Sequence, residues 1–158
     1  MLPGSSSKSV QSNASQWESV KSQLKFDEGR ELYVYDDKVK PNQGIWTVGY
    51  GHRVLPTDNL KPGQQITQAQ ADKFFEHDFN IAKTKAEAYN YRPEVTGILT
   101  NMIFQLGDQG VRNFRKMHQA LANKDYATAA LEMENSRWHN EQTPDRAKRL
   151  VTKMRAIQ

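Results

Sequence analysis

The sequence predicts an α+β protein in which a small N-terminal lobe with an antiparallel β-hairpin is joined by a long helix to a helical C-terminal lobe. Two β-favouring segments, 32–35 and 45–50, lie between helical patterns near the N-terminus. All later patterns are helical. At 158 residues the chain is too short for two independent domains. We therefore expect one folded domain at 14–158, preceded by a Ser-rich flexible tail or linker at 1–13.

The first helix carries a carboxylate at its end. Ser15 and Glu18 form a capping box, which predicts the helix start. An apolar stripe then recurs at helical spacing and leads to Glu28, and Gly29 supplies the helix stop. Glu28 is therefore expected in a partly apolar setting at the negative end of a helix. Both conditions favour the protonated form of a carboxyl group.

The two strands are expected to form the hairpin of the N-terminal lobe. Residues 32–35 read Leu-Tyr-Val-Tyr, and a loop with Pro and Gly follows at 36–44. The second strand, 45–50, alternates bulky and small side chains, so one face is nearly bare apart from a hydroxyl, which suits a groove. The bulky face holds Trp46, Val48 and Tyr50, and the small face holds Thr47, Gly49 and Gly51.

The rest of the chain predicts helices. Thr67 and Gln70 form a second capping box, at the start of a long amphipathic helix expected to end near Arg92. The helices expected after it are 93–106 with Gly107 as its stop, 111–121, 125–135, and a last helix with Thr143 as its cap and Pro144 in its first turn.

Composition limits the classes of partner. The formal charge of +4 and the pI near 9.3 favour an anionic partner such as nucleic acid, an acidic membrane surface or a cell-wall polymer. The absence of cysteine excludes disulfides, and the histidines lack a metal-ligand spacing, so we expect neither metal nor cofactor. No apolar run approaches the ~20 residues of a membrane helix, so no membrane insertion is expected.

Three motifs in order resemble the active-site region of the phage-type lysozymes. They are the Glu-Gly at 28–29, the Tyr-x-Asp at 35–37 and the Thr-x-Gly-x-Gly-His at 47–52. The likeness extends from about Trp17 to the C-terminus. It implies a lysozyme-like fold and hydrolysis of the β-1,4 bond between N-acetylmuramic acid and N-acetylglucosamine in peptidoglycan. Further matching runs lie at 101–107, 110–111, 136–140, 142–144 and 146–147.

The resemblance also implies roles for single residues. Glu28 matches the general acid, Asp37 the second carboxylate, and Thr47 the hydroxyl that helps to hold the attacking water. Glycoside hydrolysis needs this combination of one protonated and one ionised carboxyl group. The best understood members of the family invert the anomeric centre, which requires the two carboxyl groups to lie about 6.5 to 9.5 Å apart, whereas about 5 Å would indicate a covalent intermediate.

Asp36 is the rival for the second carboxylate. Extra residues at 38–43, relative to the short turn of close relatives, make the register there ambiguous. We prefer Asp37 because it keeps the two-residue step from Tyr35. Asp36 would then point away from the groove if the alternation of the strand continues that far.

Other residues are expected to support the site or bind sugar. Asp78 falls on the apolar stripe of the long helix and needs a partner there, and His52 is the candidate because family members pair the matching His and Asp. Arg146 matches a family Arg behind the catalytic Glu, where its charge would favour the ionised form of Glu28. The residues that resemble sugar-binding positions, although aromatic side chains at helical spacing are also typical of a core, are Phe104, Gln105 and Trp138.

Two other functions compete with a muramidase. One is a wall-binding or immunity-type protein that kept the fold and lost the chemistry. The other is a nucleic-acid-binding module, suggested by the basic residues of 146–155, which we interpret as the solvated face of an amphipathic helix. We expect a monomer whose partner is the glycan strand of peptidoglycan, with no nucleic acid. Without a signal peptide, it would be made in the cytoplasm and reach the wall through a holin or a secretion system.

Overall fold

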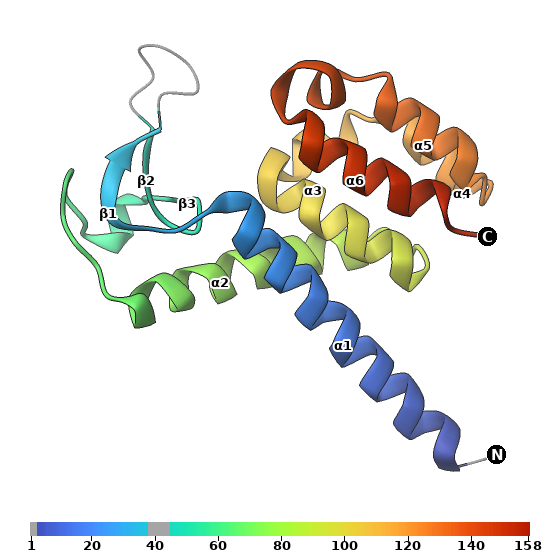
Figure 1. Ribbon diagram of the computed structural model, residues 1–158, viewed down its shortest axis with the longest axis horizontal. Helices are drawn as coiled ribbons and strands as arrows, with labels where there is room; N and C mark the ends of the chain where they lie inside the picture. The colour runs from blue at the N-terminus through green and yellow to red at the C-terminus, as the bar shows by residue number, and fades with distance from the viewer. Residues whose placement is uncertain (1–2, 38–44) are drawn as a thin grey trace. The chain divides into compact units, whose positions relative to one another are not determined.

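The structure, a computed structural model, describes the backbone of residues 3–37 and 45–158, and the side chains from residue 14 onward within these ranges. It confirms an α+β protein that is mostly helical, with a small antiparallel sheet (Figure 1). The elements are α1 (Pro3–Glu28), β1 (Glu31–Asp36), β2 (Trp46–Gly49), β3 (His52–Arg53), η1 (Pro56–Asp58), α2 (Gln68–Glu87), α3 (Pro93–Arg112), α4 (Arg115–Ala122), α5 (Tyr126–Glu134), η2 (Trp138–Gln142) and α6 (Pro144–Arg155).

The chain divides into two compact units, which are described separately. Glu18–Ile81 forms the sheet unit, and Met1–Trp17 with Ala82–Gln158 forms the helical unit. Both α1 and α2 contribute residues to each unit.

The sheet unit is built on three antiparallel strands in the order β1-β2-β3 (Figure 1). An isolated bridge between Tyr33 and Gln65 adds the loop before α2 to the edge of β1. The predicted hairpin is confirmed, whereas the two-residue strand β3 was not expected, since it is too short to show an alternating pattern. A small buried core forms where Val34 and Val48 of the sheet meet Ile66 of the following loop and Ala71 of α2.

Aromatic residues of α2 pack against the end of α1 in the sheet unit. Phe75 and Phe79 are 1% exposed, and their rings stack with centroids 6.0 Å apart. Lys25 of α1 lies over the Phe75 ring, 5.0 Å from its centroid, and Lys21 lies 5.1 Å from that of Phe79. Leu24, which lies four residues before Glu28 on the predicted apolar stripe of α1, is fully buried. Its burial helps to orient the helix that carries Glu28.

The boundaries of α1 agree with the sequence at one end only. Gly29 stops the helix as predicted: its φ is +70°, and its N–H donates to Lys25 O at 3.1 Å. The start predicted at Ser15 is wrong, because α1 begins at Pro3 and so includes most of the Ser-rich segment. A Ser and a Glu at capping-box spacing can also lie inside a helix, so this pattern alone does not fix where the helix begins. The function of residues 1–13 as a tail or linker stays a prediction.

The start of α2 confirms its capping box. Thr67 Oγ1 accepts a hydrogen bond from Gln70 N–H at 3.1 Å, and Gln70 Oε1 accepts one from Thr67 N–H at 2.8 Å. The predicted end near Arg92 is wrong, since α2 ends at Glu87. Asn90 then takes a left-handed φ of +58°, which reverses the chain before α3 begins at Pro93.

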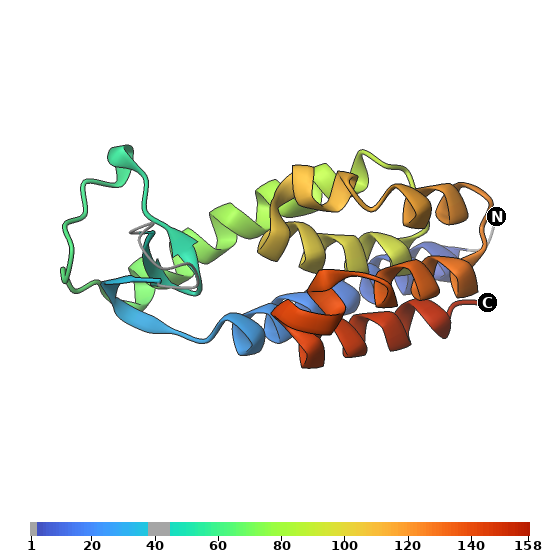
Figure 2. The same ribbon diagram turned by 90° about the horizontal axis from the view of Figure 1, so that it is seen from above.

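The helical unit buries one apolar core among α3, α4, α5 and α6. Here α5 contacts both α4 and α6, and α6 contacts α3 (Figure 2). The side chains at its centre that are 2% exposed or less include Val95, Leu99, Met102, Met117, Met133, Leu150 and Met154.

Gly107 interrupts α3 as the sequence predicted, with φ +80° and ψ 164°. The helix expected from 111 begins instead at Arg115, because 108–112 form a last turn of α3. The starts predicted for α5 and α6 are confirmed within a residue, and Asp125 caps α5 by accepting from Thr128 N–H at 3.1 Å. In the described part of the chain, no helix is both long and apolar enough to cross a bilayer.

Candidate active site

Glu28 lies against a glycine of the turn that follows β2. A Cβ atom built on Gly51 would lie 2.5 Å from Glu28 Oε2 and 3.2 Å from its carboxyl carbon. Gly51 also has a φ of +74°, which L side chains rarely adopt. The partly buried Glu28 carboxyl therefore rests on bare backbone, and both the contact and the backbone conformation require glycine at position 51.

The register of the hairpin separates Asp36 from Asp37. Tyr35 pairs with Thr47, and Asp36 pairs with Trp46, so Tyr35 and Asp36 lie on opposite faces. The pairing continues beyond β1, because Asp37 N–H donates to Ile45 O at 2.9 Å. Asp37 therefore follows Tyr35 on the Thr47 face, and Asp36 faces the side of Trp46. This is the orientation on which the choice of Asp37 depends.

Tyr35 links the two candidate carboxylates electrostatically. Burial raises the pKa of the Tyr35 phenol, and the negative charges of Asp37, Glu31 and Glu28 raise it further. Glu28 and Asp37 thus both act on the Tyr35 phenol. The expected distance between their carboxyl groups stays a prediction.

Thr47 differs from the expected open groove floor. Its side chain is 4% exposed, and its hydroxyl donates to Ile45 O at 3.2 Å. The strand alternation predicted that Thr47 faces away from Trp46, but it could not indicate that other residues cover the Thr47 side chain. The oxygen lone pairs of Thr47 remain able to accept a hydrogen bond, so the hydroxyl is oriented as an acceptor.

His52 is held between two carboxylates. Its Nδ1 lies 2.6 Å from Asp78 Oδ2, which confirms the predicted pairing, and its Nε2 lies 2.8 Å from Asp58 Oδ2. The His52 ring stacks on Phe74 with centroids 4.2 Å apart. Burial alone would lower the pKa of His52, but the hydrogen bonds with Asp78 and Asp58 raise it above the usual value.

Asp58 was not predicted from the sequence. Its Oδ2 also accepts from Leu55 N–H at 2.8 Å. Burial acts to raise the pKa of Asp58, but the hydrogen bonds from Leu55 and His52 lower it overall. The three-residue step from Leu55 to Asp58, typical of a local side-chain cap, is the only sequence signal that could have indicated this position. The His52 contact itself depends on the fold of the loop.

In the helical unit, Gln105 bridges two elements. Its Nε2 donates to Thr143 Oγ1 at 2.9 Å, and its Oε1 accepts from Trp138 Nε1–H at 2.9 Å. Thr143 therefore receives this bond and makes no side-chain cap of α6, in contrast to the prediction. Trp138 is 2% exposed, as in the core alternative, and Phe104 packs partly buried against the same core. A sugar-binding role for these residues stays a prediction.

Arg146 is buried on α6 instead of lying on a solvated face. It is 7% exposed, and its Nε donates to Asn101 Oδ1 at 2.9 Å. The apolar side of α6 is confirmed by the burial of Ala147, Leu150, Val151 and Met154. The expected position of Arg146 behind Glu28 stays a prediction.

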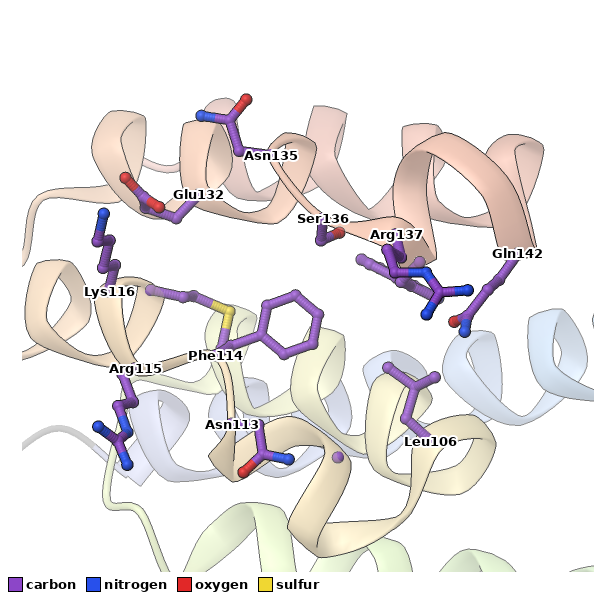
Figure 3. A pocket seen from close by; sticks show the side chains of 13 residues that line it. Leu106, Asn113, Phe114, Arg115, Lys116, Glu132, Asn135, Ser136, Arg137 and Gln142 are labelled. Carbon is purple, nitrogen blue, oxygen red and sulfur yellow. The ribbon is translucent and has the colours of Figure 1, made fainter.

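The helical unit also contains a cavity of about 660 Å³. Figure 3 shows the Phe114 ring inside it and the charged side chains of Arg115, Lys116, Arg137 and Glu132 around it. An apolar interior with a mainly cationic rim can hold a ligand that has both apolar and acidic groups. Among the described residues, no group of three or more His, Asp or Glu side chains is placed to bind a metal ion.

The chain is similar to known proteins over most of its length. The family model described as phage lysozyme matches residues 25–156. A probable T4-type lysozyme 2 of Dictyostelium discoideum is 30% identical over 161 residues, covering 85% of this chain and 92% of that protein. A probable T4-type lysozyme 1 of the same organism is 29% identical with the same coverage. A peptidoglycan hydrolase, gp36, of Pseudomonas phage phiKMV is 31% identical over 114 residues, which are 69% of this chain and 12% of that protein.

Proposed function

The chain belongs to the phage lysozyme family, and we propose that Glu28, Asp37 and Thr47 carry out its cleavage of peptidoglycan. It is a lysozyme, a hydrolase that acts on the glycan strands of peptidoglycan. The bond cleaved in this proposal is the β-1,4 link between N-acetylmuramic acid and N-acetylglucosamine. The observation that carries the assignment is the contact of the Glu28 carboxyl with the bare backbone of Gly51.

Glu28 is the proposed general acid. Glu28 is the last residue of α1, where the partial negative charge of the helix end disfavours an ionised carboxyl, and partial burial acts in the same direction. A protonated Glu28 can donate its proton to the departing sugar oxygen as the glycosidic bond breaks. Glycine at position 51 supports this role, because a side chain there would displace the Glu28 carboxyl.

Asp37 is the proposed base, and Thr47 positions the water. An ionised Asp37 takes a proton from the water that attacks the anomeric carbon, on the face of the sugar opposite the leaving group. The Thr47 hydroxyl directs its hydrogen to Ile45 O, so its oxygen can accept a hydrogen bond from that water. We infer an inverting reaction, with the carboxyl groups of Glu28 and Asp37 about 6.5 to 9.5 Å apart.

Residues outside this triad are proposed to support it. The His52–Asp78 pair anchors α2 to the strand that follows the Gly51 turn, which fixes the backbone beneath Glu28. Arg146 is proposed to hold Glu28 in position, and its positive charge would there oppose the effects of burial and of the helix end on the protonation of that carboxyl. Phe104, Gln105 and Trp138 are proposed to bind sugar, and the partial exposure of Phe104 and Gln105 supports contact by these two.

The Glu28→Gln variant tests the assignment. The amide keeps the size of the side chain but has no acidic proton, so we expect a folded protein that no longer lyses cell walls. Asp37→Asn should abolish lysis as well, and its matched control Asp36→Asn should keep it. Muropeptides released by the unmodified chain should have reducing muramic acid ends by mass spectrometry, and NMR of the first anomer formed should show inversion. Retained lysis by Glu28→Gln would remove the central assignment.

The same proposal covers where and in what form the chain acts. We propose that it works as a monomer in the periplasm or cell wall, after release by a holin or delivery by a secretion system. Light scattering after size-exclusion chromatography tests the monomer. Lysis of cells that make the chain, with and without a co-expressed holin, tests the route. Steeply salt-dependent binding to DNA without wall lysis would favour the nucleic-acid alternative.

A further inference from the structure

Tyr33 is an aromatic side chain that the sheet leaves half open to solvent. It is 46% exposed, although its neighbour Val34 is buried in the core of the sheet unit. Single exposed aromatic residues are common on protein surfaces, so exposure alone has no functional meaning. The position of Tyr33 relative to the candidate catalytic groups is what distinguishes it.

Tyr33 lies beside Tyr35, at a point where the pairing of β1 with β2 shifts register between Glu31 and Tyr35. The rings of Tyr33 and Tyr35 meet edge to face, with centroids 6.0 Å apart and planes at 60°. Tyr35 is partly buried and pairs with Thr47. An exposed ring, Tyr33, thus contacts a partly buried ring, Tyr35, and the proposed base Asp37 follows Tyr35 by two residues.

We infer that Tyr33 forms a saccharide subsite in which its ring packs against a sugar of the glycan strand, away from the bond that is cleaved. This inference rests on the proposed function. A pyranose ring presents C–H groups on its faces and hydroxyls at its edge, and tyrosine offers the complementary apolar face and polar hydroxyl. Tyr35, held edge-on against it, restricts the Tyr33 ring before substrate arrives, which lowers the entropy lost on binding.

The surrounding charges favour a neutral glycan over a polyanion. Glu31, Glu28 and Asp37 all act on the Tyr35 hydroxyl, so this face carries carboxylates. They would repel the phosphates of a nucleic acid, whose bases could otherwise stack on the same ring.

Binding in an inactive background tests the subsite separately from catalysis. In Glu28→Gln, soluble N-acetylglucosamine oligomers are titrated and followed by calorimetry and NMR. Adding Tyr33→Ala should weaken binding roughly threefold to tenfold, as expected for loss of an aromatic contact. Tyr33→Phe and Tyr33→Trp should bind close to the parent. Phe26→Ala, which removes another exposed aromatic ring of the sheet unit, is the matched control and should leave binding unchanged.

The active enzyme supplies the second measurement. Tyr33→Ala should raise KM by a similar factor with kcat nearly unchanged, because the ring acts on a sugar away from the reacting bond. Equal glycan binding by the Ala variant and its parent would overturn the inference while leaving the proposed function intact. A parent chain that neither binds glycan nor lyses walls would overturn the proposed function instead. If Tyr33→Ala does not fold, the Trp and Phe variants decide, since loss of binding in both would contradict a stacking role.

Discussion

Asp78→Asn measures how much the interaction between Asp78 and His52 contributes to the free energy of unfolding. The amide keeps the shape of the carboxylate and removes its charge. The His52 side chain is 5% exposed and that of Asp78 is 26% exposed, so the lost interaction is a partly buried, charge-assisted hydrogen bond of 2.6 Å. Such a bond contributes about 1.5 to 3 kcal/mol. The loss should stay below the ~3 to 5 kcal/mol of a fully broken buried pair, because Asp58 still contacts the ring.

The pH dependence gives this prediction its sign. The folded pKa of His52 is raised above the ~6.5 of an unfolded chain. The stabilisation by the charged ring is therefore complete below about pH 6.5 and is lost as pH rises through the folded pKa of His52. The lowered pKa of Asp58 sets the acid limit, since its contribution is present above about pH 3.8 and is lost as pH falls through its folded pKa. The penalty of Asp78→Asn should be largest between these limits.

At high pH the penalty should disappear or change sign. A neutral His52 has one N–H for two carboxylates, so one of them faces a ring lone pair, whereas an Asn amide can donate to it. Urea unfolding at pH 5.5 and pH 9.5 measures the loss of unfolding free energy in the variant at each pH. In a thermal unfolding experiment at pH 5.5, the Tm of the variant should be lower by roughly 3 to 12 °C. Glu141→Gln, which removes an exposed ion pair with Arg137, is the control and should cost under ~0.5 kcal/mol at both pH values. An equal penalty for Asp78→Asn at both pH values would refute the reasoning.

Three further substitutions test the site and the cores. Gly51→Ala should reduce lysis about a hundredfold, because the new Cβ displaces the Glu28 carboxyl, while the left-handed φ costs only about 1 to 2 kcal/mol of unfolding free energy; turbidity assays and urea unfolding measure the two effects. Gln105→Leu should lower the unfolding free energy by about 1 to 3 kcal/mol, since it leaves the buried Trp138 N–H without its acceptor; indole proton exchange by NMR reports that bond. Met102→Ala, at a position with 0% exposure, should cost about 2 to 5 kcal/mol in urea unfolding.

Each of these predictions has a contrary outcome. Full activity of a folded Gly51→Ala would mean that the Glu28 carboxyl does not depend on position 51. Unchanged protection of the Trp138 indole proton in Gln105→Leu would mean that another group accepts that bond. A loss below about 1 kcal/mol for Met102→Ala would show that the core of the helical unit closes the cavity without cost.

The second carboxylate shows how sequence and structure combined. The step from Tyr35 to Asp37 is a local pattern, and the sequence indicated Asp37 on that basis. The pairing of Asp36 with Trp46 and of Asp37 N–H with Ile45 O is what places the two side chains on opposite faces. Pattern alone could not do this, because the length of the intervening loop left the register open.

By itself the sequence determined features that depend on near neighbours. The capping box of Thr67 and Gln70, the stop at Gly29 and the break at Gly107 each follow from a side chain or a left-handed backbone within a few residues. The family motifs likewise lie in short runs. Tertiary structure decided the contacts between distant segments. These are the contact of Asp58 with His52, the bridge from Gln105 to Trp138 and Thr143, and the burial of Thr47 and Arg146. These depend on which surfaces meet after folding, and such meetings are set by the packing of the whole chain, which no local pattern encodes.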